Sequence, residues 1–495
     1  MSTKLTIYNV RVNLENTSEE FPLELADDER AHLLVKLQGI LRKWPKLARF
    51  ESVQVFKKGE PEVVYQLPNQ FLSAPMSISI IGTGYVGLVT GVGTCHIGRQ
   101  VVCVDTDAGK VRKINARIPP IYEKGLKDML QRLPAKYFSC TTDLKKAVMD
   151  TDCTFIAVGT PPKSDGSQDL SYIKTACEQL GKVLKDKPGH LVVVKSTVAP
   201  GTTETIIKKL IAKNAGHTNF RIAMVPEFLR EGLALDDFLN PFRIVIGVED
   251  DESFEAIKFI YEDFNTTFFR TSLTGAEMIK YASNSLLATK ISFANEIGNL
   301  CKKLKVDTYE VMDGVGLDKR FNRKFLNAGR GFGGSCLPKD VKALVALGKS
   351  LNEPTTLLNG VWAVNEAQPL KMVELAEKRI GPLKGKRVAV MGLAFKPGTD
   401  DVRESPAIII IKALLERGAN VVGYDSFAAG NMKKLFPNIE YAHTPFDAVK
   451  GSDVVLGVTE WPELRDDKLY RHTLFIDGMK FLNKKTSGNY EGICW

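Results

Sequence analysis

The sequence predicts an α/β protein with two doubly wound parallel sheets, a long central helix between them and a small N-terminal α+β extension. Two series of short apolar strands alternate with helical segments, one starting at residue 76 and the other at residue 386. Residues 274–304 between the two series form a helical run without proline, which predicts one long connecting helix. A chain of 495 residues has room for about two to four domains.

Each sheet is predicted from apolar runs whose length and flanking residues are typical of buried strands. The expected strands are residues 77–82, 99–107, 152–162, 190–202 and 220–228 in the first sheet, and 386–392, 419–425, 452–461 and 472–478 in the second. Strands that are apolar along their whole length are buried on both faces, which is the environment of a parallel sheet covered by helices.

The first 75 residues have a different pattern, without a catalytic signature. We expect strands at residues 5–14, 51–59 and 62–67, a helix at residues 27–44 and a linker at residues 68–75. The helix has an acidic start and a basic end, which suits its dipole. Met76 then resembles the beginning of a separate protein, and the role of the extension stays open.

The charge balance favours small anionic ligands over nucleic acid. Lysine and arginine exceed aspartate and glutamate by 67 − 58 = 9, and the excess is spread along the chain. No apolar run reaches the roughly 18 residues that a membrane span needs, and the N-terminus lacks the apolar core of a signal peptide. We therefore expect a cytoplasmic protein without membrane or nucleic-acid partners.

Eight cysteines are present, and one of them stands in an unusual context. No pair forms a C-x-x-C motif and no histidine cluster accompanies them, so neither a metal site nor a disulfide scaffold is predicted. Cys103 and Cys153 lie in apolar runs and are expected in the core. Cys336 instead lies in the glycine-rich segment GFGGSCLPKD (331–340), with charged neighbours, and we predict that it is a catalytic nucleophile.

A dinucleotide site is predicted at GTGYVG (82–87), which directly follows a strand and precedes a helix. Gly82 permits the tight turn, Gly84 lets a diphosphate approach the backbone, and Gly87 allows close packing of helix and strand. Asp105 ends the next strand, where an acid accepts hydrogen bonds from a ribose diol and repels a 2′-phosphate. The cofactor is therefore expected to be NAD bound to a Rossmann-like domain, whereas MGLAF (391–395) in the second domain lacks this fingerprint.

Seven motifs occur in order, and together they resemble the UDP-glucose/GDP-mannose dehydrogenase family. They are GTGYVG, VGTPP (158–162), KSTVAPGT (195–202), VPEFLREG (225–232), EMIKYASN (277–284), GFGGSCLPKD and GLAFKPGTDDVRESP (392–406). The resemblance covers residues 76–480. It implies four-electron oxidation of a nucleotide-sugar C6 alcohol to a carboxylate with two NAD+, through a thiohemiacetal and a thioester on the cysteine.

The resemblance also assigns roles to residues around Cys336. Lys280 and Asn284, four apart on the long helix, would stabilise alkoxide charge, and Glu231 would be a general base near the catalytic water. Lys339 would favour the thiolate and Asp340 would orient or deprotonate water. Further expected contacts are Tyr85, Val86, Lys110, Thr160, Thr197, Lys339 and Arg403 for the cofactor, and Glu227, Phe228, Leu229, Arg230, Arg320, Phe325, Leu326, Asn327, Gly333 and Lys396 for the substrate. Thr197 would also act in catalysis, near the catalytic water.

Arg320 matches a family arginine that reaches a neighbouring subunit, which implies a homodimer or a higher homo-oligomer. The chain departs from the family pattern beside it, at Phe321 and Asn322, and again at Met479, where an arginine is usual. Segments 226–247 and 277–297 favour UDP-glucose as the substrate. GDP-mannose or another nucleotide sugar is the alternative, and a catalytically silent nucleotide-sugar-binding scaffold is a remote one.

The motifs divide the chain into four expected parts. They are an extension at 1–75, an NAD-binding domain at 76–273, a central helical dimerisation region at 274–380 and a UDP-sugar-binding α/β domain at 381–495.

Overall fold

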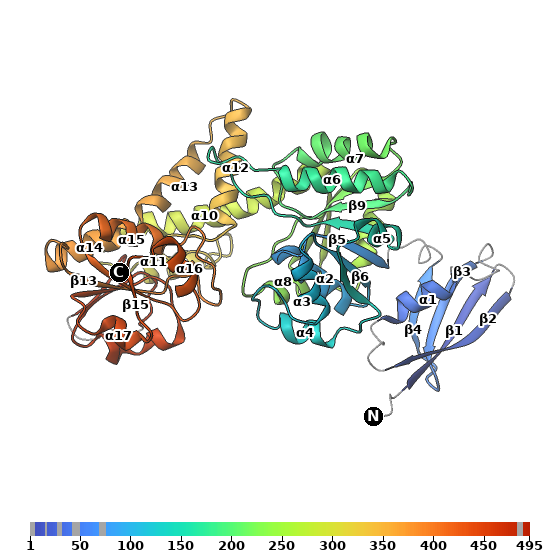
Figure 1. The fold of residues 1–495 in the computed structure, drawn as a ribbon, viewed down its shortest axis with the longest axis horizontal. Helices are drawn as coiled ribbons and strands as arrows, with labels where there is room; N and C mark the ends of the chain where they lie inside the picture. The colour runs from blue at the N-terminus through green and yellow to red at the C-terminus, as the bar shows by residue number, and fades with distance from the viewer. Residues whose placement is uncertain (1–4, 15–16, 27–31, 42–49, 69–75, 483–488) are drawn as a thin grey trace. The chain divides into compact units, whose positions relative to one another are not determined.

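A computed structural model describes residues 5–14, 17–26, 32–41, 50–68, 76–482 and 489–495 (Figure 1). The chain forms two compact units. The first comprises residues 1–161 and 169–280, and the second comprises residues 162–168 and 281–495.

The N-terminal extension contains an antiparallel sheet of order β2-β1-β3-β4 with one helix on it. Its elements are β1 (Leu5–Leu14), β2 (Thr17–Ala26), α1 (Leu33–Leu41), β3 (Phe50–Lys57) and β4 (Val63–Pro68). Strand β2 was not predicted, because it is rich in acids and contains Pro22; an edge strand tolerates both features. Parts of the expected helix (27–31 and 42–44) and most of the expected linker (69–75) lie outside the described residues.

The first parallel sheet has the strand order of a dinucleotide-binding fold. Its strands are β5 (Ser77–Ile81), β6 (Gln100–Val104), β7 (Phe138–Thr141), β8 (Cys153–Ile156), β9 (Leu191–Val194), β10 (Arg221–Met224), β11 (Arg243–Val248) and β12 (Thr267–Thr271), in the order β12-β11-β10-β9-β8-β5-β6-β7. The chain direction reverses once, because β11 is antiparallel to β10. The switch point, where nucleotides bind in such sheets, lies between β5 and β8.

Helices cover both faces of this sheet, as expected for a parallel sheet (Figure 1). One face carries α2 (Tyr85–His96), α3 (Ala108–Asn115), α4 (Leu126–Arg132), α8 (Ala234–Leu239) and α9 (Asp251–Ile260), and the other carries α5 (Leu144–Met149), α6 (Ser171–Leu184) and α7 (Lys208–Ala215). Alternate residues of β9 illustrate the two layers: Val193 packs into the first face and Val192 into the second.

The predicted long helix is confirmed as α10 (Leu273–Leu304), which runs from the first unit into the second. Gly298 does not interrupt it, and a Cβ there would lie only 2.9 Å from the Cβ of Cys494, so close packing explains the glycine. The helices that follow are α11 (Thr308–Gly316), α12 (Leu337–Ser350), α13 (Thr356–Ala367) and α14 (Leu370–Ile380).

The second sheet is fully parallel and repeats the order of the first, as β15-β14-β13-β16-β17-β18. Its strands are β13 (Arg387–Met391), β14 (Asn420–Tyr424), β15 (Glu440–Tyr441), β16 (Val454–Gly457), β17 (Leu474–Asp477) and β18 (Tyr490–Gly492), and its helices are α15 (Pro406–Glu416), α16 (Ala429–Leu435) and α17 (Pro445–Val449). The two-residue β15 and the three-residue β18 are too short to give an apolar run, so the sequence did not predict them.

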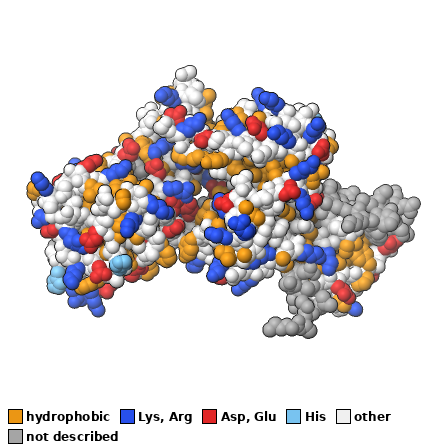
Figure 2. All heavy atoms as spheres, in the orientation of Figure 1, with side chains coloured by type: hydrophobic (Ala, Val, Ile, Leu, Met, Phe, Trp, Pro, Cys, Tyr) orange, Lys and Arg blue, Asp and Glu red, His pale blue; other side chains and the backbone are white. Residues whose placement is uncertain are grey.

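Basic and acidic side chains are interspersed on the face drawn in Figure 2. This agrees with a net charge spread along the chain. Among the described residues, no helix is long and apolar enough to span a membrane.

Candidate active site

The GTGYVG loop has the geometry that a dinucleotide diphosphate requires. Gly82 has a φ of +97°, and a Cβ there would lie 2.8 Å from the carbonyl oxygen of Ala157. A Cβ on Gly87 would lie 1.9 Å from the carbonyl oxygen of Gly82, so this position tolerates no side chain. Gly84, the N-cap of α2, has open space beside it. The loop therefore presents a bare helix N-terminus to an anion, and its residues fit NAD.

Asp105 closes β6 beside this loop. Its carboxylate accepts hydrogen bonds from the amides of Thr83 and Asp107, both at 3.0 Å, and from the Thr83 hydroxyl at 2.5 Å. Partial burial acts to raise the pKa of Asp105, but these bonds and Lys110, whose Nζ lies 3.9 Å away, lower it on balance. The residue is thus an anionic acceptor where the sequence predicts the ribose to bind.

Thr160 and Thr197 meet at the carboxyl ends of β8 and β9. The Thr160 hydroxyl donates to the carbonyl oxygen of Thr197 at 2.7 Å. The structure thus brings together two predicted site residues, one strand away from the glycine loop.

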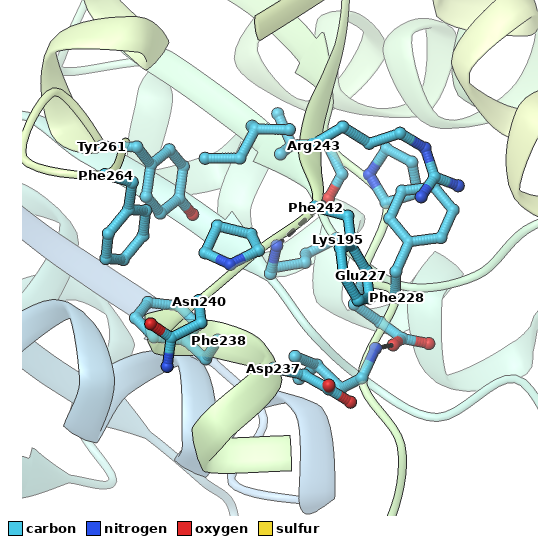
Figure 3. A pocket seen from close by; sticks show the side chains of 15 residues that line it. Lys195, Glu227, Phe228, Asp237, Phe238, Asn240, Phe242, Arg243, Tyr261 and Phe264 are labelled. Atoms are coloured by element: carbon cyan, nitrogen blue, oxygen red, sulfur yellow. Dashed lines mark hydrogen bonds between the residues drawn. The ribbon is translucent and has the colours of Figure 1, made fainter. Parts of the chain in front are cut away.

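A buried cluster of charged side chains lies just after the carboxyl ends of β9 and β10, and it consists of Lys195, Glu227 and Lys280. Lys280 Nζ lies 2.9 Å from Glu227 Oε1, and Lys195 Nζ donates to the carbonyl oxygen of Val225 at 3.4 Å. Lys195 and Glu227 both line the pocket shown in Figure 3. Burial lowers the pKa of Lys195 to about 8, although Glu227 acts to raise it. Burial acts to raise the pKa of Glu227, but Lys280, the Leu229 amide and Lys195 together lower it.

The loop that follows Glu227 carries the predicted substrate residues. The Phe228 ring lies 4.0 Å from the guanidinium of Arg243 and 5.3 Å from Lys280 Nζ. Arg230 is exposed and forms a two-pronged ion pair with Asp237, at 2.6–3.2 Å. Glu231 is half-buried, and its Oε2 atom is buried.

The second unit holds Cys336 at the N-cap of α12. The helix dipole favours negative charge at this position, so a thiolate is stabilised there. Cys336 is half-buried, with the Ser335 hydroxyl 3.6 Å from its sulfur. One turn into the helix, the buried Asp340 accepts from the Asn284 amide at 2.6 Å and pairs with Lys339 at 2.5 Å.

The glycines before Cys336 are explained by close packing. A Cβ on Gly333 would lie 2.2 Å from the carbonyl oxygen of Glu404, and one on Gly334 would lie 2.5 Å from the Phe395 ring. The sequence motif names Gly333 as a substrate contact, which this packing does not test. The contact of Gly333 with the substrate stays a prediction.

The other predicted contacts have local partners in the second unit. Arg320 pairs with Asp318, Arg403 pairs with Asp401, Asn327 accepts from Arg323, and Lys396 lies over the Phe395 ring. Leu326 is 4% exposed within the core of the second sheet, and Phe325 has a φ of +66°. These positions do not by themselves show a binding surface, and their roles stay predictions.

Asp425 stands at the end of β14, the position that Asp105 takes in the first sheet. It accepts from the amides of Leu393 at 2.7 Å and Ala394 at 3.0 Å and from the Trp461 indole at 3.0 Å, while its other oxygen accepts two further amides. All its acceptor capacity is therefore used within the protein. Asp425 therefore has no lone pair left for a ribose hydroxyl, and the expectation that the second sheet does not bind a dinucleotide stays a prediction.

Two buried polar residues near the site were missed in the sequence. Lys195 opens the KSTVAPGT motif, and its signal was a lysine directly after four strand residues that are all apolar. Glu123 lies in the irregular segment between α3 and α4, where no periodicity marks it. It is 5% exposed and accepts the amides of Gly232 and Ala234 at 2.7 and 2.9 Å.

Comparison with known proteins agrees with this geometry. Models of the UDP-glucose/GDP-mannose dehydrogenase family match residues 76–265 (NAD binding domain), 274–367 (central domain) and 389–484 (UDP binding domain). A UDP-glucose 6-dehydrogenase of Haloferax volcanii is 44% identical over 431 residues, which cover 84% of this chain and 100% of the relative.

Two solved structures are also similar. A UDP-glucose dehydrogenase from Pyrobaculum islandicum has a TM-score of 0.81 and 42% identity, with 86% of this chain and 98% of that chain covered. A UDP-D-ManNAc dehydrogenase from Pyrococcus horikoshii has a TM-score of 0.75 and 27% identity, with 84% and 99% covered. The chain therefore belongs to the UDP-glucose/GDP-mannose dehydrogenase family, and its first parallel sheet is the NAD-binding domain of that family.

Proposed function

We propose that this enzyme oxidises UDP-glucose at C6 to UDP-glucuronate, with two NAD+ and one water, through a covalent intermediate on Cys336. The observation that carries the proposal is the position of Cys336 at the N-terminus of α12, one turn from the buried Asn284–Asp340 pair. The names of the relatives support UDP-glucose as the substrate.

The first oxidation removes a hydride from C6 and a proton from its hydroxyl group. NAD+, when bound, supplies the hydride acceptor. Lys280 and Asn284 lie one turn apart on the same face of α10, so both act on the oxygen that becomes negatively charged. Thr160 and Thr197 hold the strand ends beside the cofactor loop.

The Cys336 thiolate then adds to the aldehyde carbon, and the oxygen takes a proton from solvent to give a thiohemiacetal. Loss of a second hydride, for which the second NAD+ would be the acceptor, and return of the hydroxyl proton to solvent give a thioester. Water attacks the thioester carbonyl, the carbon–sulfur bond breaks, and the thiolate leaves. Glu231 takes the proton of the water as general base, Asp340 orients that water, and Thr197 contacts it.

The remaining site residues complete the proposal. Tyr85, Val86, Lys110, Lys339 and Arg403 contact NAD, and Glu227, Phe228, Leu229, Arg230, Phe325, Leu326, Asn327, Gly333 and Lys396 contact the nucleotide sugar. The division of the chain at residues 75, 273 and 380 and the cytoplasmic location belong to the same proposal.

The enzyme is also proposed to be a homodimer that pairs through α10. Leu286, Phe293 and Leu300 are spaced by seven residues and are 62%, 50% and 54% exposed. A heptad of exposed apolar side chains is the pattern of a helix that packs against another helix. Arg320 is 80% exposed at its side chain, as a contact to a neighbouring subunit requires.

The test is turnover with a panel of UDP-glucose, UDP-N-acetylmannosamine and GDP-mannose, followed by NADH absorbance. We expect UDP-glucose to give about two NADH per sugar, and Cys336→Ser to stop at or before the thioester stage. Full turnover by the serine variant would refute the nucleophile. A response to GDP-mannose alone would favour the alternative substrate, and no response to any sugar would favour the scaffold.

A further inference from the structure

A hydrogen-bonded group in the first unit joins the cofactor loop to the turn that carries Glu231. Its members are Tyr85, the first residue of α2 within GTGYVG, then Glu123, and the backbone amides of Gly232 and Ala234. We call it the Tyr85–Glu123 clamp.

The contacts of the clamp are short and mutually consistent. The Tyr85 hydroxyl donates to Glu123 Oε2, and the Gly232 amide donates to both the Tyr85 oxygen at 2.8 Å and Glu123 Oε2 at 2.7 Å. Glu123 Oε1 accepts from the Ala234 amide at 2.9 Å. One buried carboxylate and one phenol thus hold two positions on the turn, the amides of Gly232 and Ala234.

The turn has no side-chain cap of its own. Leu233 is the N-cap of α8, and it provides no hydrogen-bonding side chain. The Glu123 carboxylate, 5% exposed, satisfies an otherwise unpaired amide at this helix N-terminus and complements the helix dipole there. Without it, the turn would lose two charge-assisted hydrogen bonds, from the Gly232 and Ala234 amides.

Glu231 directly precedes the clamped amide of Gly232. Its Oε2 atom is buried, so a small shift of the backbone changes the surroundings of its carboxylate. At the other end, Tyr85 follows Gly84, which has open space beside it where a cofactor diphosphate would bind. An anion that fixes this first turn of α2 therefore also fixes the phenol that holds the turn.

We propose that Tyr85 and Glu123 are positioning residues that couple cofactor binding to the placement of Glu231. The inference rests on the proposed role of Glu231 as general base in thioester hydrolysis. It predicts that loss of the clamp slows hydrolysis, while the first hydride transfer is little changed.

The test uses Tyr85→Phe, which removes only the hydroxyl group, and Glu123→Gln, which keeps the shape of the side chain. Tyr172→Phe is the matched control, because Tyr172 is 62% exposed on α6 in the same unit. We expect kcat to fall about 10–100-fold in both clamp variants. At saturating NAD+, which removes any loss of cofactor affinity from the readout, the first NADH burst should change less than about fivefold, and a sugar adduct on the protein should accumulate in intact mass spectra.

Combination with Glu231→Gln separates the inference from the proposed function. If the clamp acts through Glu231, adding Tyr85→Phe to Glu231→Gln lowers kcat no further. If the two substitutions lower kcat independently, so that their fold-changes multiply, the proposed coupling is wrong and the base assignment stands. The same conclusion follows if the clamp variants have a lower melting temperature but wild-type kcat. Wild-type turnover of Glu231→Gln itself would overturn the base assignment, and the inference with it.

Discussion

Lys280 and Glu227 form an ion pair at 2.9 Å in which both side chains are at most 5% exposed. Removal of one partner from such a pair leaves an uncompensated buried charge, which costs about 3–5 kcal/mol. The pair therefore matters to the fold as well as to the proposed chemistry, and the two contributions can be measured separately.

Glu227→Gln should lower the free energy of unfolding by about 3 kcal/mol and lower kcat. The reason is that the positive charges of Lys280 and Lys195 then lose the negative charge of Glu227 that compensates them. Urea unfolding measures the first effect. Glu227→Gln combined with Lys280→Met should recover part of the stability and remain inactive. Glu252→Gln, which breaks the exposed pair with Arg221, should change stability by less than about 1 kcal/mol.

Asp340→Asn should lower kcat about 100-fold, because Asp340 holds the Asn284 amide and is proposed to orient the hydrolytic water. Rapid-mixing kinetics should still show the first NADH burst. Asp453→Asn removes an exposed acid that pairs with Lys386, and it should leave kcat unchanged. An equal loss of burst and steady-state rate would place Asp340 in the first oxidation instead.

Asp105→Ala should raise the KM for NAD+ about tenfold, because the ribose loses its anionic acceptor, and it should leave the KM for UDP-glucose unchanged. Turnover with NADP+ should improve in the same variant. Asp143→Ala removes the N-cap of α5 in the same unit and is the control for general loss of stability. A parallel rise of both KM values would contradict the assignment.

Acid should destabilise the first unit through His190, whose Nε2 lies 2.7 Å from the Thr154 hydroxyl. Burial, with help from Lys187 and Arg221, lowers the pKa of His190 from 6.5 to about 3. Between these values the unfolded chain binds a proton that the folded chain does not, so stability falls as the pH falls below 6.5. At pH 5 the loss is about 2 kcal/mol.

The measurement is urea unfolding of the wild type and of His190→Asn at pH 7 and pH 5. From pH 7 to pH 5, the free energy of unfolding of the variant should rise by about 2 kcal/mol relative to that of the wild type. The reason is that the variant has no titrating group at position 190. His443→Asn, at an exposed position, should show no such movement. An unchanged difference for His190→Asn would mean that other groups set the acid sensitivity.

Phe293→Glu should convert the proposed dimer into monomers, because it places a charge in the exposed apolar heptad of α10. Light scattering gives the mass directly. Phe446→Glu alters a phenylalanine that is 62% exposed on α17, outside the heptad, and should leave the mass unchanged. A wild-type mass of 54.8 kDa would already refute the pairing.

The sequence predicted those parts of the fold whose signal is local. The central helix, the main strands of both sheets and the glycine loop each follow from a continuous pattern within a few residues. Strand β11 was not among the predicted strands, and its direction follows from no local pattern either, because a strand antiparallel to β10 has the same apolar composition as a parallel one. Strand β2 was missed because charge and Pro22 conceal a strand at a sheet edge.

The residues of the candidate site likewise fall into those that a local motif identifies and those that only long-range contacts reveal. The motifs named Cys336, Lys280 and Asp340, but not Glu123, because its importance arises from contacts with a turn 109 and 111 residues away. Nor could the motifs reveal that a Cβ on Gly333 would meet the Glu404 carbonyl, 71 residues further along the chain. Long-range contacts of this kind are fixed by the packing of elements, which no local pattern records.

Asp105 and Asp425 occupy the same place in two sheets of the same strand order, yet only Asp105 remains partly exposed and open to a ligand. Asp425 is 5% exposed and already accepts five donors, including the Trp461 indole. An aspartate after the second strand is therefore no sufficient signature of a dinucleotide site. What distinguishes the two aspartates is the number of carboxylate lone pairs that the surrounding protein leaves unused. The Trp461 indole nitrogen uses one of those of Asp425.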